Sequence, residues 1–169
     1  MKRIIFFVIP ILLVSCKNGI TSSEEILFNP ENLSSLSLEN ITDFWQGDSI
    51  AFKSNTNYFF KIYEGFLEGI ELRAANKFIE IDVFKSKEIA LNAIEEFRSV
   101  ISMYTIESND HTIIKEKWWH MPNSYLTIFV NKYNTFISIH YSLESDEEFT
   151  QNIAVEVMKR MESNVMISL

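Results

Sequence analysis

The chain has 169 residues, 47% hydrophobic and 22% charged, with 23 acidic side chains against 15 lysines and arginines. This composition is typical of a globular protein and excludes a disordered acidic tail, which would contain far fewer apolar residues. A single cysteine excludes a disulfide-stapled domain, and the net charge of −8 argues against a general nucleic-acid binder, because neutralising phosphates requires clustered cations.

The amino terminus has the pattern of an export signal. Two cations, Lys2 and Arg3, precede an apolar run that extends from Ile4 to Val14 and is interrupted only by Pro10. This order of charge and apolar run is typical of a secretory signal peptide. A helix over such a run reaches ~16 Å, about half of the hydrocarbon core of a bilayer, so a membrane-spanning helix is the weaker interpretation.

The residues Leu13, Val14, Ser15 and Cys16 resemble the lipobox of bacterial lipoproteins. The resemblance implies that the signal peptide, 1–15, is removed and that Cys16 is thioether-linked to diacylglycerol. It also implies that the new amino terminus accepts an acyl chain such as palmitate. Two or three acyl chains hold a protein at a membrane far more firmly than one. An ordinary signal peptide with a cysteine near its end, or an uncleaved short anchor, is the alternative.

The residue after Cys16 bears on which membrane holds the anchor. In Gram-negative lipoproteins an aspartate there commonly marks inner-membrane retention, so Lys17 favours the outer membrane if the host is Gram-negative. Removal of 1–15 leaves 13 cations against 23 acids, a net charge of −10. An anionic domain is repelled by an anionic bilayer, so we expect the lipid, and not a basic patch, to provide the attachment.

The mature chain is predicted to consist of a lipid-anchored tether, 16–28, and a single domain, 29–169. The tether is assigned because its first residues are polar and show no helical or strand period. Within the domain the apolar period changes between two and 3.6, which predicts alternating strands and helices. The expected elements are a short helix near 30–38, an apolar strand 58–63, a hairpin 66–74 with 79–83, a helix 87–103, a strand 111–119, a hairpin 126–130 with 137–141, a helix 146–162 and an apolar tail 165–169.

This order of elements predicts an α+β fold of two layers, an antiparallel sheet covered on one face by two helices. The charged face of the first hairpin, made of Glu71, Arg73, Glu80 and Asp82, is expected to be exposed to solvent. The repeated order of hairpin and helix resembles small exported α+β domains such as the PsbP/Mog1-like group. That resemblance lies in element order alone and implies no function.

The sequence lacks the motifs of common enzyme classes. Gly65 and Gly69 form the only close glycine pair, so no phosphate-binding loop is present, and no G-x-S-x-G sequence marks a serine nucleophile. His111, His120 and His140 are nine and twenty residues apart, with no other ligand at the spacing of a zinc site. We therefore expect no catalytic residue, no metal site and no cofactor.

One segment is a candidate for binding, because it contains the adjacent residues Trp118 and Trp119. Adjacent side chains on a strand point to opposite faces, so one tryptophan can join the core while the other faces outward. An outward tryptophan beside further aromatic rings would form a platform that binds sugars, peptides or apolar ligands. The alternative is a tryptophan packed under a loop. The candidate binding surface comprises Trp118, Trp119, His120, Tyr125 and Phe129.

These observations predict a lipoprotein of the cell envelope whose domain is a non-catalytic ligand-binding or protein-binding module. The alternative is an accessory, inhibitor or immunity lipoprotein that recognises a protein through an acidic surface. An enzyme would require polar residues that converge in a pocket, which the linear sequence does not reveal. The expected partners are the membrane, through the lipid on Cys16, and a protein or a small apolar or sugar ligand, with no nucleic acid.

Overall fold

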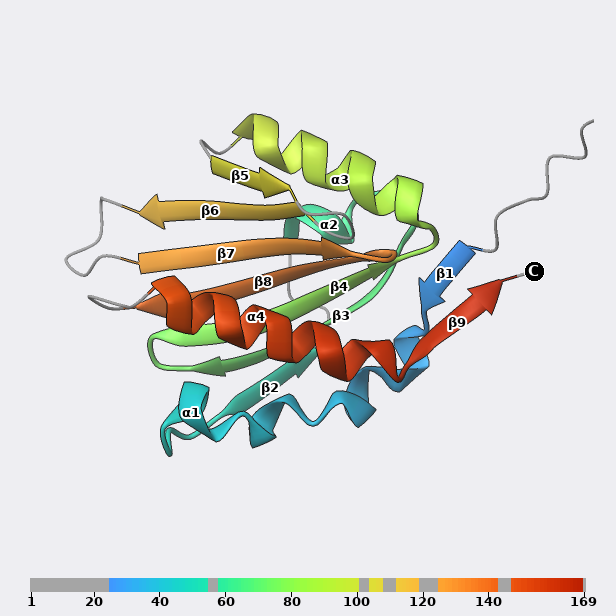
Figure 1. Cartoon of the computed structure of the whole chain (residues 1–169). Coiled ribbons are helices and arrows are strands. Elements are labelled where there is room, and N and C mark those ends of the chain that lie inside the picture. The colour runs from blue at the N-terminus through green and yellow to red at the C-terminus, as the bar shows by residue number, and fades with distance from the viewer. Residues whose placement is uncertain are drawn as a thin grey trace, which may run out of the picture.

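An antiparallel sheet forms the centre of the fold, as Figure 1 shows. The computed structural model describes residues 25–54, 58–100, 104–107, 112–118, 125–142 and 147–168. Within these residues seven strands form the main sheet, and the predicted α+β class and antiparallel pairing are confirmed. In spatial order the strands are β2 (Ala51–Ser54), β3 (Phe66–Ala74), β4 (Lys77–Phe84), β8 (Thr135–Ser142), β7 (Tyr125–Lys132), β6 (Thr112–Trp118) and β5 (Tyr104–Glu107).

Two long helices pack against this sheet. They are α3, Lys87–Val100, and α4, Glu147–Glu162, which lie close to the helices that the sequence predicts at 87–103 and 146–162. The shorter helical elements are the 3₁₀ helices η1 (Pro30–Leu36) and η2 (Leu38–Asn40) and the single turns α1 (Thr42–Trp45) and α2 (Tyr58–Lys61).

One face of the sheet, called the α4 face, contains the larger hydrophobic core. Successive side chains of a strand point to opposite faces, so every second residue of each central strand reaches α4. Each fully buried isoleucine side chain contributes about 1.5 to 3 kcal/mol to folding. The buried residues of the central strands and α4 on this face are Ile79, Ile81, Val83, Ile128, Val130, Ile137, Ile139, Ile153, Val157 and Met161.

The opposite face, called the α3 face, contains a second and smaller core. It joins α3 to the sheet, and its phenylalanines are named the aromatic cluster. The two helices therefore lie on opposite faces, and the expectation that both cover one face is wrong in this respect. The reason is that Phe129 and Phe136 alternate with the apolar residues of the α4 face, so both sides of strands β7 and β8 are apolar. The cluster comprises Phe59, Phe60, Phe84, Phe97, Phe129 and Phe136.

The folded part begins before the predicted boundary at residue 29. Glu25–Phe28 forms strand β1, which pairs antiparallel with β9, Val165–Ser168, in a separate two-stranded sheet. Phe28 is buried in the larger core, so residues 25–28 belong to the folded part. The apolar tail of the sequence thus pairs with the first strand and not with the main sheet.

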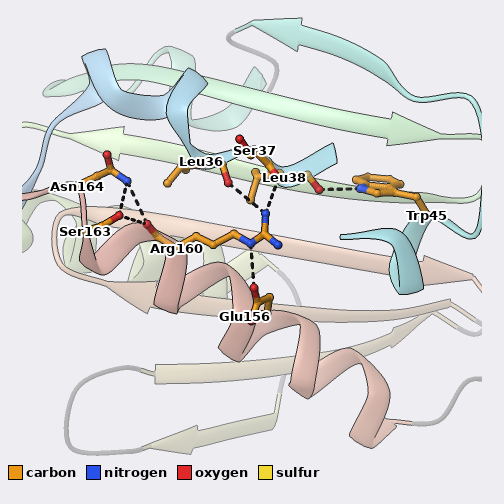
Figure 2. Close-up of polar contacts among 8 residues, drawn as sticks. All are labelled: Leu36, Ser37, Leu38, Trp45, Glu156, Arg160, Ser163 and Asn164. Carbon is orange, nitrogen blue, oxygen red and sulfur yellow. Dashed lines mark hydrogen bonds and ion pairs between the residues drawn. The ribbon is translucent and has the colours of Figure 1, made fainter. Parts of the chain in front are cut away.

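The segment after β1 packs against α4 through polar and apolar contacts. Asn29 caps η1 by accepting a hydrogen bond from the backbone nitrogen of Glu31, and Pro30 occupies the first helical position. Figure 2 shows the side chain of Arg160 reaching from α4 to this segment, where Nη1 donates to the carbonyl oxygens of Leu36 and Ser37. These bonds satisfy carbonyls at the end of η1.

Two further expectations are wrong. Residues 58–61 form the helical turn α2 and not a strand. This turn lies beside α3, and it buries Phe60 in the aromatic cluster. The charged face of the β3–β4 hairpin is not solvated, since Glu71, Glu80 and Asp82 are buried and only Arg73 is exposed. No helix in the described ranges is long and apolar enough to cross a bilayer.

Candidate binding face

The candidate site lies on the α3 face, at the end of the sheet beyond the aromatic cluster. Two residues after Phe136 on β8 lies Ser138, and two further on lies His140, so His140 shares this face with the cluster. The strand register then aligns four residues from neighbouring strands β3, β4, β8 and β7. This line, called the Arg73 row, consists of Arg73, Phe78, His140 and Thr127.

The first three side chains of the row form a stack. The guanidinium carbon of Arg73 lies 4.8 Å from the ring centroid of Phe78. On the other side of Phe78, the ring of His140 lies 4.9 Å away and is nearly parallel, at 4°. Because β3 and β8 flank β4, the phenyl ring lies between a cation and an imidazole. The cation is attracted to the negative face of the ring, and the imidazole stacks on the opposite face.

His140 is neutral at pH 7. Burial, and to a smaller extent the positive charge of Arg73, lower the pKa of His140 to about 4. Its Nδ1 atom shares a hydrogen bond of 2.8 Å with Oγ1 of the buried Thr127. This bond fixes the orientation of the imidazole ring. The stack on Phe78 therefore has Thr127 bonded to His140 at one end and Arg73 at the other.

Arg73 is held by a carboxylate on its own strand. Its Nε and Nη2 atoms donate to the two carboxylate oxygens of Glu71 at 2.7 and 2.8 Å, a bidentate pair. Hydrogen bonding to Glu71 is the largest cause that raises the pKa of Arg73. The remaining nitrogen, Nη1, makes no hydrogen bond within the described residues, and the side chain is 47% exposed. The guanidinium therefore keeps one donor group for solvent or a ligand.

The predicted binding surface is only partly brought together. Trp118 and Tyr125 are register partners on β6 and β7, and Tyr125 lies two residues from Thr127, next to the Arg73 row. Trp119 and His120 lie outside the described residues. Phe129 is 5% exposed and stacks on Phe136 inside the aromatic cluster, so it is not part of an exposed platform. The sequence pattern misses this burial because it does not show that α3 covers the second face.

The Arg73 row itself was not predicted as a site. The hairpin turn after Ala74 makes Arg73 and Phe78 register partners, which strand alternation could have indicated. The approach of His140 depends on β4 pairing with β8, and strands so far apart in the chain leave no local signal of their pairing. The described residues contain no group of three or more side chains that could hold a metal ion.

Comparison with known proteins leaves the chain without an assigned family. Neither protein-family models nor curated proteins give a match. Among solved structures, the chain is similar to the extracellular domain of PknH from Mycobacterium tuberculosis, with 10% sequence identity and a TM-score of 0.46 over 81% of this chain and 98% of that one. At this level of similarity the match transfers neither fold nor function.

Proposed function

We propose that this protein is an exported lipoprotein, anchored through Cys16, whose domain is a non-catalytic binding module. The Arg73 row is the observation that carries the binding role. It places a stacked cation, phenyl ring and imidazole on the end of the α3 face, beside the register pair of Trp118 and Tyr125. Tryptophan, tyrosine and arginine are the residue types that dominate binding energy at recognition surfaces.

The bonding within the row supports recognition and not catalysis. Arg73 is held by Glu71, and His140 is held by Thr127, so both polar groups are fixed before any ligand arrives. A surface that is fixed in advance loses little conformational entropy on binding, which favours affinity. The His140 imidazole is stacked on Phe78, and its Nδ1 bonds to a hydroxyl that is itself buried, so Thr127 is not placed to attack a substrate.

The stack also defines which ligand groups the row suits. Because both faces of the Phe78 ring are occupied, the row presents ring edges outward, and aromatic edges carry positive potential. Nη1 of Arg73 adds a hydrogen-bond donor at the same place. A ligand with hydroxyl or carbonyl oxygens, such as a saccharide or a peptide backbone, matches this chemistry.

Pull-down from detergent extracts of the host tests the binding role. We expect the anchored protein to capture a ligand and to retain it at high salt. The double variant Trp118→Ala with Arg73→Gln should capture no ligand. The matched control is Leu91→Ala, which changes an exposed residue on the outer side of α3. Equal capture by both variants would exclude the open end of the α3 face as the binding surface.

The anchor needs a separate test. A Cys16→Ala variant should leave the membrane fraction and lose the mass of the acyl chains. A variant that still partitions into membranes with the same processed mass would show that the lipobox interpretation is wrong.

A second candidate function is protein recognition through an acidic surface, as in an accessory, inhibitor or immunity lipoprotein. The outward side of α3 favours it, because Glu88 and Glu95 are exposed beside Leu91. A partner held by these charges should be lost at high salt, since exposed ion pairs are screened. The same pull-down therefore separates the two candidates.

A further inference from the structure

Strand β2 is the outermost strand of the main sheet on the β3 side, as Figure 1 shows. Within the described residues it pairs with β3 alone, and all four of its residues are exposed. An edge strand presents backbone N–H and C=O groups that can pair with a further strand. The backbone of β2 is thus open on its outer side.

The two faces of this edge carry different chemistry. Phe52 is the register partner of Leu72, so it lies on the α4 face, where it is 61% exposed. Lys53 is the register partner of Glu71, so it lies on the α3 face, where its side chain is 56% exposed. One face of the edge is therefore aromatic and the other is cationic.

A second cation reinforces the charge beside Lys53. Arg73 pairs in register with Ala51, whose small side chain leaves room at the edge. The Nζ atom of Lys53 and the Nε atom of Arg73 lie 3.8 and 2.7 Å from the same oxygen of Glu71. The Glu71 side chain is only 6% exposed, and its register partner Glu80 is buried too. The acids lie beneath the surface, while both cations face solvent.

We propose that the outer edge of β2 binds an extended segment of a partner protein in which acidic residues alternate with apolar ones. A strand added to β2 places successive side chains on opposite faces, so acids would lie beside Lys53 and Arg73 while apolar residues cover Phe52. The chain as a whole has a net charge of −8, and the two solvent-facing cations Lys53 and Arg73 make this edge a place where an acidic segment can find cationic partners. This goes beyond the proposed function, because the edge accepts a strand whether or not the open end of the α3 face binds a ligand.

Fluorescence anisotropy of a labelled peptide of alternating valine and aspartate, added to the full chain, tests the proposal. We expect binding that weakens about fivefold in Lys53→Gln, the effect of losing one exposed ion pair. Binding should also weaken in Phe52→Ser. The matched control is Lys61→Gln, an exposed lysine outside β2 that should leave binding unchanged. Two further peptides test for strand pairing. One carries N-methyl groups on the odd-numbered amides and the other on the even-numbered amides. Because only alternate amides of an added strand face β2, one of these peptides should lose binding and the other should keep it.

The proposal is overturned if the unmodified peptide does not bind, or if Lys61→Gln weakens binding as much as Lys53→Gln. It is also overturned if both N-methylated peptides bind as well as the parent, since attraction would then not involve a strand. Analytical ultracentrifugation tests whether a second copy of this chain binds the edge instead. A dimer that dissociates in Phe52→Ser would show this and would overturn the proposed partner.

Discussion

The carboxamide of Asn134 joins the backbone of Phe28 through two hydrogen bonds across 106 residues of sequence: Phe28 N donates to Oδ1 at 2.5 Å, and Nδ2 donates to Phe28 O at 3.2 Å. The same Nδ2 donates to the carbonyl of Phe84 at 2.6 Å. One buried side chain therefore ties the end of β1 and the end of β4 to the turn between β7 and β8.

We expect Asn134→Ala to lower the free energy of unfolding by about 3 kcal/mol, because the Phe28 and Phe84 groups would be left buried without these partners. Asn134→Asp should also destabilise, since it lacks the Nδ2 donor. Chemical denaturation measures both, and Asn92→Ala on the exposed side of α3 should stay within about 0.5 kcal/mol of the parent protein. An Asn134→Ala protein as stable as that control would contradict this account of the junction.

Arg160 makes a second junction, between α4 and the segment that follows β1. We expect Arg160→Ala to destabilise the protein by about 1 to 2 kcal/mol, because the carbonyls of Leu36 and Ser37 lose a charged donor. Thermal unfolding measures the loss. The neighbouring cation Lys159 is exposed in the same helical turn. Lys159→Ala is therefore the control, because it removes the same positive charge but leaves the contact of Arg160 intact. Equal effects of the two variants would assign the loss to helix electrostatics instead.

Gly69 is required by the buried carboxylate of Asp82, its register partner. A Cβ atom at this position would lie 2.6 Å from Oδ1 of Asp82 and 3.4 Å from the carbonyl oxygen of Ile81. We expect Gly69→Ala to cost about 1 to 3 kcal/mol, as for other overpacked core positions. Gly47 has a positive φ of 80°, which strains any side chain, but a Cβ atom there would meet nothing within 4 Å. Because asparagine tolerates positive φ better than most residues, Gly47→Asn should cost less than Gly69→Ala in the same denaturation experiment.

The stability of the domain should depend on pH through His140. Because the pKa of His140 falls from 6.5 to about 4 on folding, the unfolded chain binds a proton that the folded chain does not bind between these values. Stability therefore decreases as the pH falls through this window. Since the ring is only half-buried, we expect a loss of about 1 kcal/mol between pH 6.5 and 5. His140→Gln should remove this part of the pH dependence, and identical slopes for the two proteins would show that His140 does not titrate as described.

Local patterns in the sequence were sufficient for much of the fold. The last helix, the β7–β8 hairpin and the short helix after residue 29 each depend on residues close together in the chain, and each is confirmed. The positions that were wrong depend on distant contacts. Phe129 alternates as an outward residue would, but α3 covers it, and Glu71 has the position of a solvated acid, but Arg73 and Lys53 cover it.

The candidate site follows the same division. The sequence indicated Trp118 and Tyr125 because, of two adjacent tryptophans on a strand, one must face outward and can lie beside other aromatic rings. It did not indicate that Arg73, Phe78 and His140 would align, because their alignment requires three strands in a specific order and register. The charge of Arg73 and its place in the strand predicted a residue on the surface. The structure adds that its guanidinium lies over the Phe78 ring, which makes it part of the candidate site.

Site-specific photocrosslinking in the native host tests the central claim, that the end of the α3 face at the Arg73 row is the binding surface. A photoreactive benzoylphenylalanine would replace Phe78, which is half-buried within the row, and in a second strain Leu91, which is exposed on the outer side of α3. We predict a discrete crosslinked product from position 78 and none from position 91. A product from position 91 alone, or none from either position, would contradict the claim.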